Sequence, residues 1–227
     1  MTAAPRPNTD VSHRWLGRIT FDEALSMQEE IVRSHAELGD TILLLEHEPV
    51  YTTGRLGKDE NLPPAAGAVP LRRISRGGDV TYHGPGQLVG YVLADLRARG
   101  GDVHLFLRSL EAGVIALLHD LGVAASRVSG RTGAWVLDGN DQNDARKIAS
   151  IGIGVRRGIS MHGFAVNVSV DLAAFDAIVP CDLEGVRMTS VERETGRPAP
   201  SIEQASALAA ERIREALPPR TFAGARA

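Results

Sequence analysis

The sequence predicts an α+β domain with a mixed, largely antiparallel sheet flanked by helices. Its apolar segments of strand length come in clusters, and the amphipathic segments of helical length stand at intervals between them. A strict alternation of strand and helix would instead predict a doubly wound parallel fold. The 227 residues are 43% apolar and 23% charged, which suits one large soluble domain with a real core. With no internal repeat or linker, we expect a single domain over 11–218 and flexible termini at 1–10 and 219–227.

Three long helices are predicted from capping residues followed by apolar residues at helical spacing. Two of them open with a capping box, in which a Ser or Thr side chain and a Glu or Gln three residues later satisfy backbone N–H groups. Glycine or proline ends each helix. The start and stop residues are, in chain order, Thr20 with Glu23 and Gly39, Asp102 and Gly122, and Ser201 with Gln204 and Pro218.

The expected strands are short apolar or alternating runs bounded by turn residues. The run at 134–137 is followed by a polar turn at 138–144, and Arg156, Arg157 and Gly158 join the last two runs as a hairpin. The expected strands are 41–45, 50–53, 69–74, 88–93, 134–137, 147–155 and 159–170.

Bulk composition excludes several classes of function. A net charge of −3 gives no overall basic excess for nucleic acid. The single cysteine, Cys181, rules out an internal disulfide and suggests a reducing compartment. No run approaches the ~20 apolar residues of a membrane span, and the N-terminus has no apolar signal region. We therefore expect a cytoplasmic protein that binds neither nucleic acid nor membrane.

Residues 76–87 are the most informative segment of the chain. Four glycines and one proline in this stretch disfavour a regular helix or a central strand. The segment nevertheless concentrates hydrogen-bonding side chains, which is typical of a loop that contacts a ligand. Those side chains belong to Arg76, Asp79, Thr81, Tyr82, His83 and Gln87.

Cys181 and Lys147 are the candidates for chemistry. Cys181 follows Pro180, and Lys147 begins the apolar segment 147–152. A lone cysteine is more often an inert core residue, and such a lysine usually extends to the surface. If the ammonium lay beside the thiol, however, it would favour the thiolate. The pair could then exchange the proton that acyl transfer through a thioester requires.

His83 and His162 each lie beside glycine in candidate site segments, although a structural role for at least one of them is expected. A zinc site is a weak alternative, because no Cys-x-x-Cys or His-Glu-x-x-His spacing occurs. The chain has no Walker A sequence, no Gly-x-Ser-x-Gly elbow, and no dinucleotide fingerprint after a strand. We expect neither a cofactor nor a metal.

Four ordered blocks resemble the octanoyl-acyl carrier protein:protein octanoyltransferases, also called lipoyl(octanoyl) transferases. The resemblance spans roughly residues 41–191, and four blocks in order make it far more specific than any one of them. The blocks are 76–87 with Tyr91, 147–152, 162–167, and Pro180 with Cys181.

The resemblance implies the fold of biotin and lipoate protein ligases and a two-step transfer without a cofactor. An octanoyl (or lipoyl) group would leave the acyl carrier protein for Cys181, with Lys147 as the dyad partner, and then pass to a lysine of a lipoyl domain. The lipoyl domains implied are those of 2-oxoacid dehydrogenases and the glycine-cleavage H protein. Backbone N–H groups near Ile151 or Gly152 would hold the thioester oxyanion. The acyl pocket implied comprises Arg76, Gly77, Gly78, Asp79, Val80, Thr81, Tyr82, His83, Ser150, Ile151, Gly152, Gly163, Phe164 and Ala165.

Alternatives stay open beside this resemblance. The family usually has glycine after the cysteine, whereas this chain has Asp182, whose carboxylate would oppose the thiolate unless it is paired or points away. A catalytically impaired acyl-binding paralogue is therefore one alternative. Others are an ATP-dependent lipoate-protein ligase, which would need no cysteine, and a papain-like hydrolase, whose local sequence is not found.

The implied partners are acidic proteins, so an exposed basic patch is expected to steer them to the enzyme. The sequence offers two clusters for this patch, Arg72 with Arg73 and Arg156 with Arg157. We expect charge reversal there to weaken carrier-protein affinity in a salt-dependent way. For either cluster alone, a solvated surface is the simpler interpretation.

Overall fold

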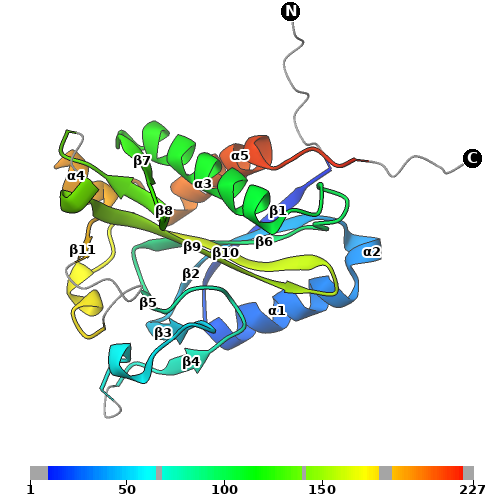
Figure 1. The fold of residues 1–227 in the computed structure, drawn as a ribbon, viewed down its shortest axis with the longest axis horizontal. Coiled ribbons are helices and arrows are strands. Elements are labelled where there is room, and N and C mark those ends of the chain that lie inside the picture. Colours follow the sequence, from blue (N-terminus) through cyan, green and yellow to red (C-terminus); the bar gives the residue numbers. More distant parts are fainter. Residues whose placement is uncertain (1–9, 65–67, 140–141, 179–185, 222–227) are drawn as a thin grey trace, which may run out of the picture.

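The computed structural model describes residues 10–64, 68–139, 142–178 and 186–221 (Figure 1). Its main sheet has eight strands in the order β1-β2-β6-β10-β9-β8-β7, with β11 paired to β9. The pairs β1–β2 and β9–β11 are parallel and the others antiparallel, which confirms the predicted mixed sheet. The strands are β1 Ser12–Ile19, β2 Thr41–His47, β6 Gln87–Leu93, β7 Ala125–Val128, β8 Arg131–Val136, β9 Arg146–Arg156, β10 Ile159–Asn167 and β11 Arg187–Met188.

A second, three-stranded sheet lies beside the first, below it in Figure 1. It consists of β3 Val50–Thr53 between β4 Leu71–Arg73 and β5 Val80–His83. Strand β5 corrects the expectation that residues 76–87 form only a loop. Its four residues contain neither glycine nor proline, so they can pair with β3 at the edge of the small sheet.

Helices cover both faces of the main sheet (Figure 1). On one face lie α3 Val103–Asp120 and α5 Ile202–Ala216, packed against each other, and on the other lies α1 Phe21–Arg33. The shorter helices are α2 His35–Leu38, α4 Val191–Thr195, and the 3₁₀ turns η1 Asp59–Asn61, η2 Gln142–Asp144 and η3 Leu172–Phe175.

The predicted capping signals are confirmed, and one helix boundary is not. Thr20 with Glu23 and Ser201 with Gln204 form complete capping boxes. The first helix, however, ends at Arg33 instead of continuing to Gly39, because Ser34 leaves the helical conformation and a separate short helix follows. Strands β1 and β7 and helix α4 are not among the elements that the sequence patterns predicted.

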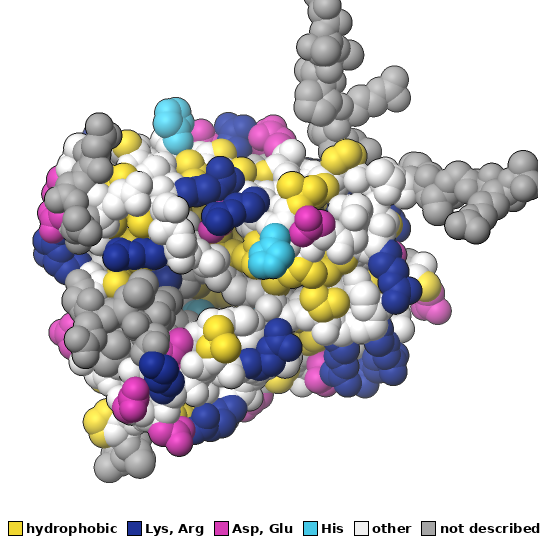
Figure 2. All heavy atoms as spheres, in the orientation of Figure 1, with side chains coloured by type: hydrophobic (Ala, Val, Ile, Leu, Met, Phe, Trp, Pro, Cys, Tyr) yellow, Lys and Arg dark blue, Asp and Glu magenta, His cyan; other side chains and the backbone are white. Residues whose placement is uncertain are grey.

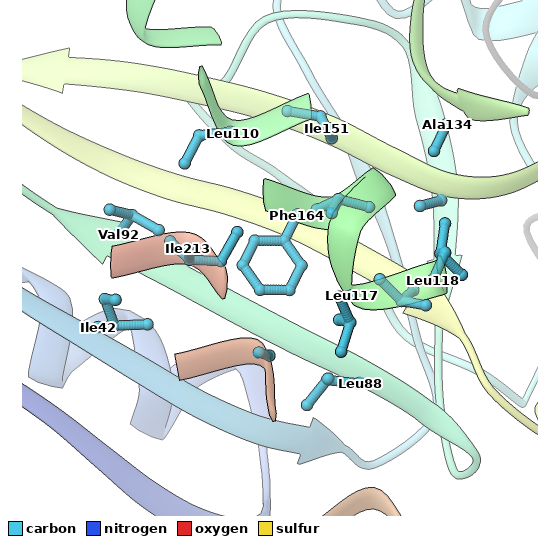
Figure 3. Packing of buried hydrophobic residues seen from close by; sticks show 14 of the residues in the cluster. Ile42, Leu88, Val92, Leu110, Leu117, Leu118, Ala134, Ile151, Phe164 and Ile213 are labelled. Carbon is cyan, nitrogen blue, oxygen red and sulfur yellow. The ribbon is translucent and has the colours of Figure 1, made fainter. Parts of the chain in front are cut away.

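The larger core cluster lies between the sheet and the α3–α5 pair, with Phe164 of β10 at its centre (Figure 3). A Cβ added to Gly90 of β6 would lie 2.1 Å from the Phe164 ring, so only glycine leaves room for this ring. A smaller cluster fills the space between α1 and the opposite face. The main sheet is therefore fixed on both faces, and β6, β10 and β9 can act as the rigid wall of a site.

In the stretches that the structure describes, no helix combines the length and apolarity needed to cross a membrane.

Candidate functional site

A cavity of about 740 Å³ opens where the two sheets meet. Its wall is the surface of β6, β10 and β9, and it is closed by β5, by the loop after β3, by the start of α3 and by the turn before β8. Figure 2 shows the hollow near the centre of this face, with apolar and basic side chains above and below it. The volume is in the range of small-molecule sites.

The cavity brings together most of the predicted site residues. Lys147 and thirteen of the fourteen predicted pocket residues line it: Arg76, Gly77, Gly78, Asp79, Val80, Thr81, His83, Ser150, Ile151, Gly152, Gly163, Phe164 and Ala165. Their roles remain predictions.

Tyr82 is the exception among the predicted pocket residues. It is not a lining residue, and its buried ring packs against Tyr51 and Phe175, with ring centroids 5.4 and 5.6 Å away. Cys181 and Asp182 lie outside the described residues.

The glycine segment bridges the two sheets through its backbone. Gly77 donates its N–H to the carbonyl of Ile153 in β9 at 2.9 Å, and Arg76 donates to the carbonyl and hydroxyl of Thr52 in β3. A Cβ on Gly152 would lie 3.1 Å from the Gly77 carbonyl oxygen. The close approach of two backbones, rather than conformational freedom alone, therefore explains glycine at this position.

Asp79 anchors the outer loop to the glycine segment. Its carboxylate accepts from the Asn61 side-chain amide at 2.6 Å and from the backbone N–H of Val80 at 2.7 Å. Both side chains are buried. This pair fixes the loop that follows β3 against the cavity, a role the sequence did not indicate.

Lys147 is buried, with 3% of its surface exposed, and its Nζ lies 5.2 Å from the centre of the Trp135 ring. An ammonium over an aromatic face is stabilised by the ring quadrupole. Gly133 of β8 leaves room for the stem of the lysine, because a Cβ there would lie 3.1 Å from Lys147 Cε. Strand β11 pairs Met188 with Lys147, so the chain that follows Cys181 returns directly alongside the lysine.

A buried carboxylate holds β8 in this position. Glu111 of α3 is 1% exposed and accepts from the backbone N–H of Gly133 at 3.2 Å. It also accepts from Arg108 at 2.6 Å and from Arg127 at 3.1 Å. Nothing in the sequence pattern of the helix distinguished this glutamate, since only tertiary packing turns it towards the sheet.

Histidines and a tyrosine form a neutral polar cluster beside the cavity. Burial lowers the pKa of His47 and His162 to about 4 and that of His83 to about 3, so all three are uncharged at neutral pH. His47 donates Nδ1–H to the Ile19 carbonyl, and its Nε2 accepts from Tyr91 at 2.7 Å. Burial raises the pKa of Tyr91, which keeps its hydroxyl protonated as that donor.

His83 and His162 both line the cavity but differ in their partners. His83 bonds through Nδ1 to Gln87 at 2.7 Å and through Nε2 to Thr52 at 3.2 Å, as expected for a structural histidine. His162 is 3% exposed, and neither ring nitrogen has a hydrogen-bond partner within the described residues. Its backbone N–H is held by Gln28, and its φ of 63° is a conformation that few non-glycine residues adopt. The predicted structural role thus fits His83 better than His162.

Basic side chains outnumber acidic ones around the cavity. Among the described lining residues, the acidic one is Asp79, whose carboxylate is already bonded. The basic ones are Arg55, Lys58, Arg76, Arg131 and Lys147. Such a wall attracts anionic ligands or acidic protein surfaces.

Three of the four arginines expected to form the docking patch are engaged in ion pairs with neighbouring acids. The pairs are Arg72–Asp22, Arg73–Asp59 and Arg156–Glu29, at 2.7–2.8 Å. Arg157 is exposed in the turn between β9 and β10 and does not line the cavity. Three of the four charges are thus balanced by neighbouring carboxylates, and a role of these clusters in docking stays a prediction.

No group of three or more His, Cys, Asp and Glu side chains among the described residues is arranged to hold a metal ion.

The family model described as the lipoyl protein ligase A/B catalytic domain matches residues 20–213. A curated octanoyltransferase from Geotalea uraniireducens is 50% identical over 190 residues, covering 83% of this chain and 85% of that protein. One from Geobacter sulfurreducens is 47% identical over 197 residues, covering 86% of this chain and 80% of that protein.

Solved structures support the predicted fold. A lipoate-protein ligase A bound with ATP superposes with a TM-score of 0.71 at 18% identity, covering 95% of this chain and 90% of that one. The Aquifex aeolicus biotin protein ligase in complex with biotin and ATP superposes with a TM-score of 0.54 at 14% identity, covering 90% of this chain and 69% of that one. Likeness at this identity concerns the fold alone, and it confirms the biotin and lipoate protein ligase architecture.

Proposed function

The chain belongs to the lipoyl protein ligase A/B catalytic domain family and is an octanoyltransferase, and from that premise we propose that it carries the octanoyl group on the thiol of Cys181. The observation that carries this proposal is the buried position of Lys147 at the cavity, beside the strand that follows the cysteine. An enzyme that activated a free acid with ATP would have no use for the thiol.

In the first step Lys147 holds the proton of the Cys181 thiol as its ammonium, and the thiolate attacks the carbonyl carbon of the octanoyl thioester. The tetrahedral intermediate then collapses, the bond to the carrier sulfur breaks, and Lys147 returns its proton to the departing thiolate. The products are an octanoyl-cysteine and the free thiol of the carrier.

In the second step the amine of the lipoyl-domain lysine attacks the same carbonyl carbon. The bond to the Cys181 sulfur breaks, the amide forms, and a proton from the attacking nitrogen returns the cysteine to its thiol through Lys147. Transfer to an amine rather than to water distinguishes this reaction from that of a hydrolase.

The backbone of β9 supports Ile151 as the donor that stabilises the oxyanion. In an antiparallel pair, successive residues direct their N–H and C=O groups to opposite edges of the strand. The Ile153 carbonyl faces away from β10, because it accepts from Gly77. Ile151, two positions earlier, directs its N–H to that same edge, whereas Gly152 directs its N–H towards β10. An N–H aimed where charge develops lowers the barrier.

The acyl chain would extend from Lys147 along β9 and β10, where Ile151 and Phe164 supply apolar wall. Its donor would be the acyl carrier protein and its acceptor a lipoyl domain, which are the substrate classes that the family implies. We also propose the cytoplasm as the compartment, since the lone cysteine must stay reduced to act.

Intact mass spectrometry tests the proposal directly. The protein is mixed with octanoyl-acyl carrier protein without ATP, and then with an apo lipoyl domain, beside the variants Cys181→Ser and Lys147→Ala. We expect an octanoyl adduct that maps to Cys181 and then moves to the lipoyl-domain lysine, no adduct with Cys181→Ser, and slower formation with Lys147→Ala. Modification of the lipoyl domain only when ATP and free octanoate are supplied would overturn the proposal. An adduct that never moves on would indicate an impaired acyl-binding protein.

A further inference from the structure

The rim of the cavity combines apolar and basic side chains from two separate segments, of which Arg55, Leu56 and Val103 are exposed and Arg131 is half-buried. On the loop after β3, Arg55 is exposed and Leu56 is 71% exposed. On the opposite segment, Val103 at the start of α3 is 37% exposed, and Arg131 begins β8. All four line the cavity. We call these four residues the cationic rim.

The two arginines of the cationic rim have no acidic partner within the described residues, unlike Arg72, Arg73 and Arg156. A neighbouring carboxylate offsets the positive potential of an exposed arginine and weakens its attraction for an acidic partner. No such carboxylate offsets the charge of Arg55 or Arg131 within the described residues.

Arg131 and Lys147 also contact the same aromatic ring. The Arg131 guanidinium carbon is 5.6 Å from the centre of the Trp135 ring, and the Lys147 Nζ is 5.2 Å from the same point. The two cations therefore share one ring, so a partner that contacts Arg131 lies next to the path by which an acyl group reaches Lys147.

The loop that carries Arg55 is fixed rather than free to move away from the cavity. Arg55 donates its backbone N–H to the Arg76 carbonyl at 3.1 Å, and Leu56 donates to Gly78 at 3.3 Å. Asn61 and Asp79 anchor the far end of this loop. A preformed surface of this kind costs little ordering entropy when a partner binds.

From these observations we propose that the cationic rim is the docking surface for the acyl carrier protein. This inference rests on the proposed function, because it names the surface through which that donor reaches the same cavity. The carrier presents acidic side chains and a phosphodiester on its pantetheine arm, which complement Arg55 and Arg131. Leu56 and Val103 supply the apolar contacts that fix the complex once charge has steered it.

The experiment measures kcat/KM for octanoyl transfer at low and high salt with two donors, octanoyl-acyl carrier protein and octanoyl-pantetheine. The second donor has neither the protein surface nor the phosphate. The variants are Arg55→Glu and Arg131→Glu, with Arg131→Gln added in case reversal at the ring impairs folding. Arg157→Glu is the matched control, since Arg157 is an exposed arginine outside the cavity lining.

At low salt we expect charge reversal in the rim to lower kcat/KM for the carrier-bound donor by about tenfold, with the loss shrinking as salt is added. The loss with octanoyl-pantetheine should be at least about fivefold smaller, and Arg157→Glu should match the wild type with both donors. Equal losses with both donors, or no loss with the carrier, would overturn the docking surface. If the wild-type enzyme still transfers octanoyl from the carrier in those cases, the proposed function is retained. If the wild-type enzyme does not transfer it, the proposed function is rejected.

Discussion

The contact between Glu111 and Gly133 predicts how strongly a residue of α3 controls the lysine of the site. Replacing Glu111 by alanine removes the acceptor of the Gly133 N–H and the partner of Arg108 and Arg127. Gly133 is then free to shift towards Lys147, whose stem lies close to it. We expect Glu111→Ala to lower both stability and the rate of acyl transfer.

The magnitude follows from which of these partners can reach water. Arg108 and Arg127 are about half exposed, so they exchange the carboxylate for solvent, and each lost pair costs under about 1 kcal/mol. The Gly133 N–H is buried and loses its partner, at about 1–3 kcal/mol. We therefore expect Glu111→Ala to lower the free energy of unfolding by about 3 kcal/mol. Glu111→Gln, which keeps an oxygen for Gly133, should cost only about 1 kcal/mol.

The assay combines urea denaturation with steady-state octanoyl transfer. A shift of Gly133 against Lys147 should lower kcat while leaving KM for the acyl carrier protein unchanged, because the cationic rim keeps its charges. Arg108→Gln is the control for the loss of an exposed pair and should change neither quantity by much. A Glu111→Ala enzyme that is destabilised as expected but retains the wild-type kcat would refute the link from Glu111 through Gly133 to the lysine.

Three further predictions concern the core, acid stability and the outer loop. Gly90→Ala should lower the free energy of unfolding, measured with denaturant, by about 2 kcal/mol, because its Cβ meets the Phe164 ring. Adding Phe164→Leu should recover part of this loss, whereas additive losses from the two substitutions would contradict the contact. Burial lowers the pKa of His47 from its ordinary value of 6.5 to about 4, so the stability that its neutral ring contributes is fully present above pH 6.5. That stability is lost as the pH falls to about 4, where the free energy of unfolding is lower by about 3 kcal/mol. Unfolding measured at several pH values should therefore depend less on pH in His47→Gln, and an unchanged slope would reject this. Asn61→Ala removes a donor to the Asp79 carboxylate, so it should lower the free energy of unfolding by about 2 kcal/mol and speed proteolysis of the outer loop. A variant loop that is cleaved at the wild-type rate would show that other contacts hold it.

Signals confined to a few neighbouring residues were predicted correctly. Both capping boxes form, and most of the expected strands appear within a few residues of their predicted bounds. Seven of the twelve residues of the glycine segment line a cavity, and their contact with a ligand stays a prediction. Such features depend on backbone geometry and local hydrogen bonds, which the adjacent side chains themselves supply. The extent of the domain, residues 11–218, stays a prediction.

Features that join distant segments could not be predicted in this way. Strand β5 exists because β3, some thirty residues earlier, offers a free edge to a stretch that local composition assigned to a loop. The position of Tyr82 away from the cavity follows from its packing against Tyr51 and Phe175, and the neutral histidines follow from their burial. None of these environments is encoded in a short window of sequence.

The sequence by itself determined the α+β fold class, the family and the cavity-forming segments, because ordered motifs carry that information along the chain. Only the tertiary structure decided which charges face the cavity. It pairs Arg72, Arg73 and Arg156 with acidic residues from other segments and leaves Arg55 and Arg131 at the rim. The reason is that an ion pair depends on a distance of a few ångströms between side chains, and folding alone sets that distance for residues far apart in the chain.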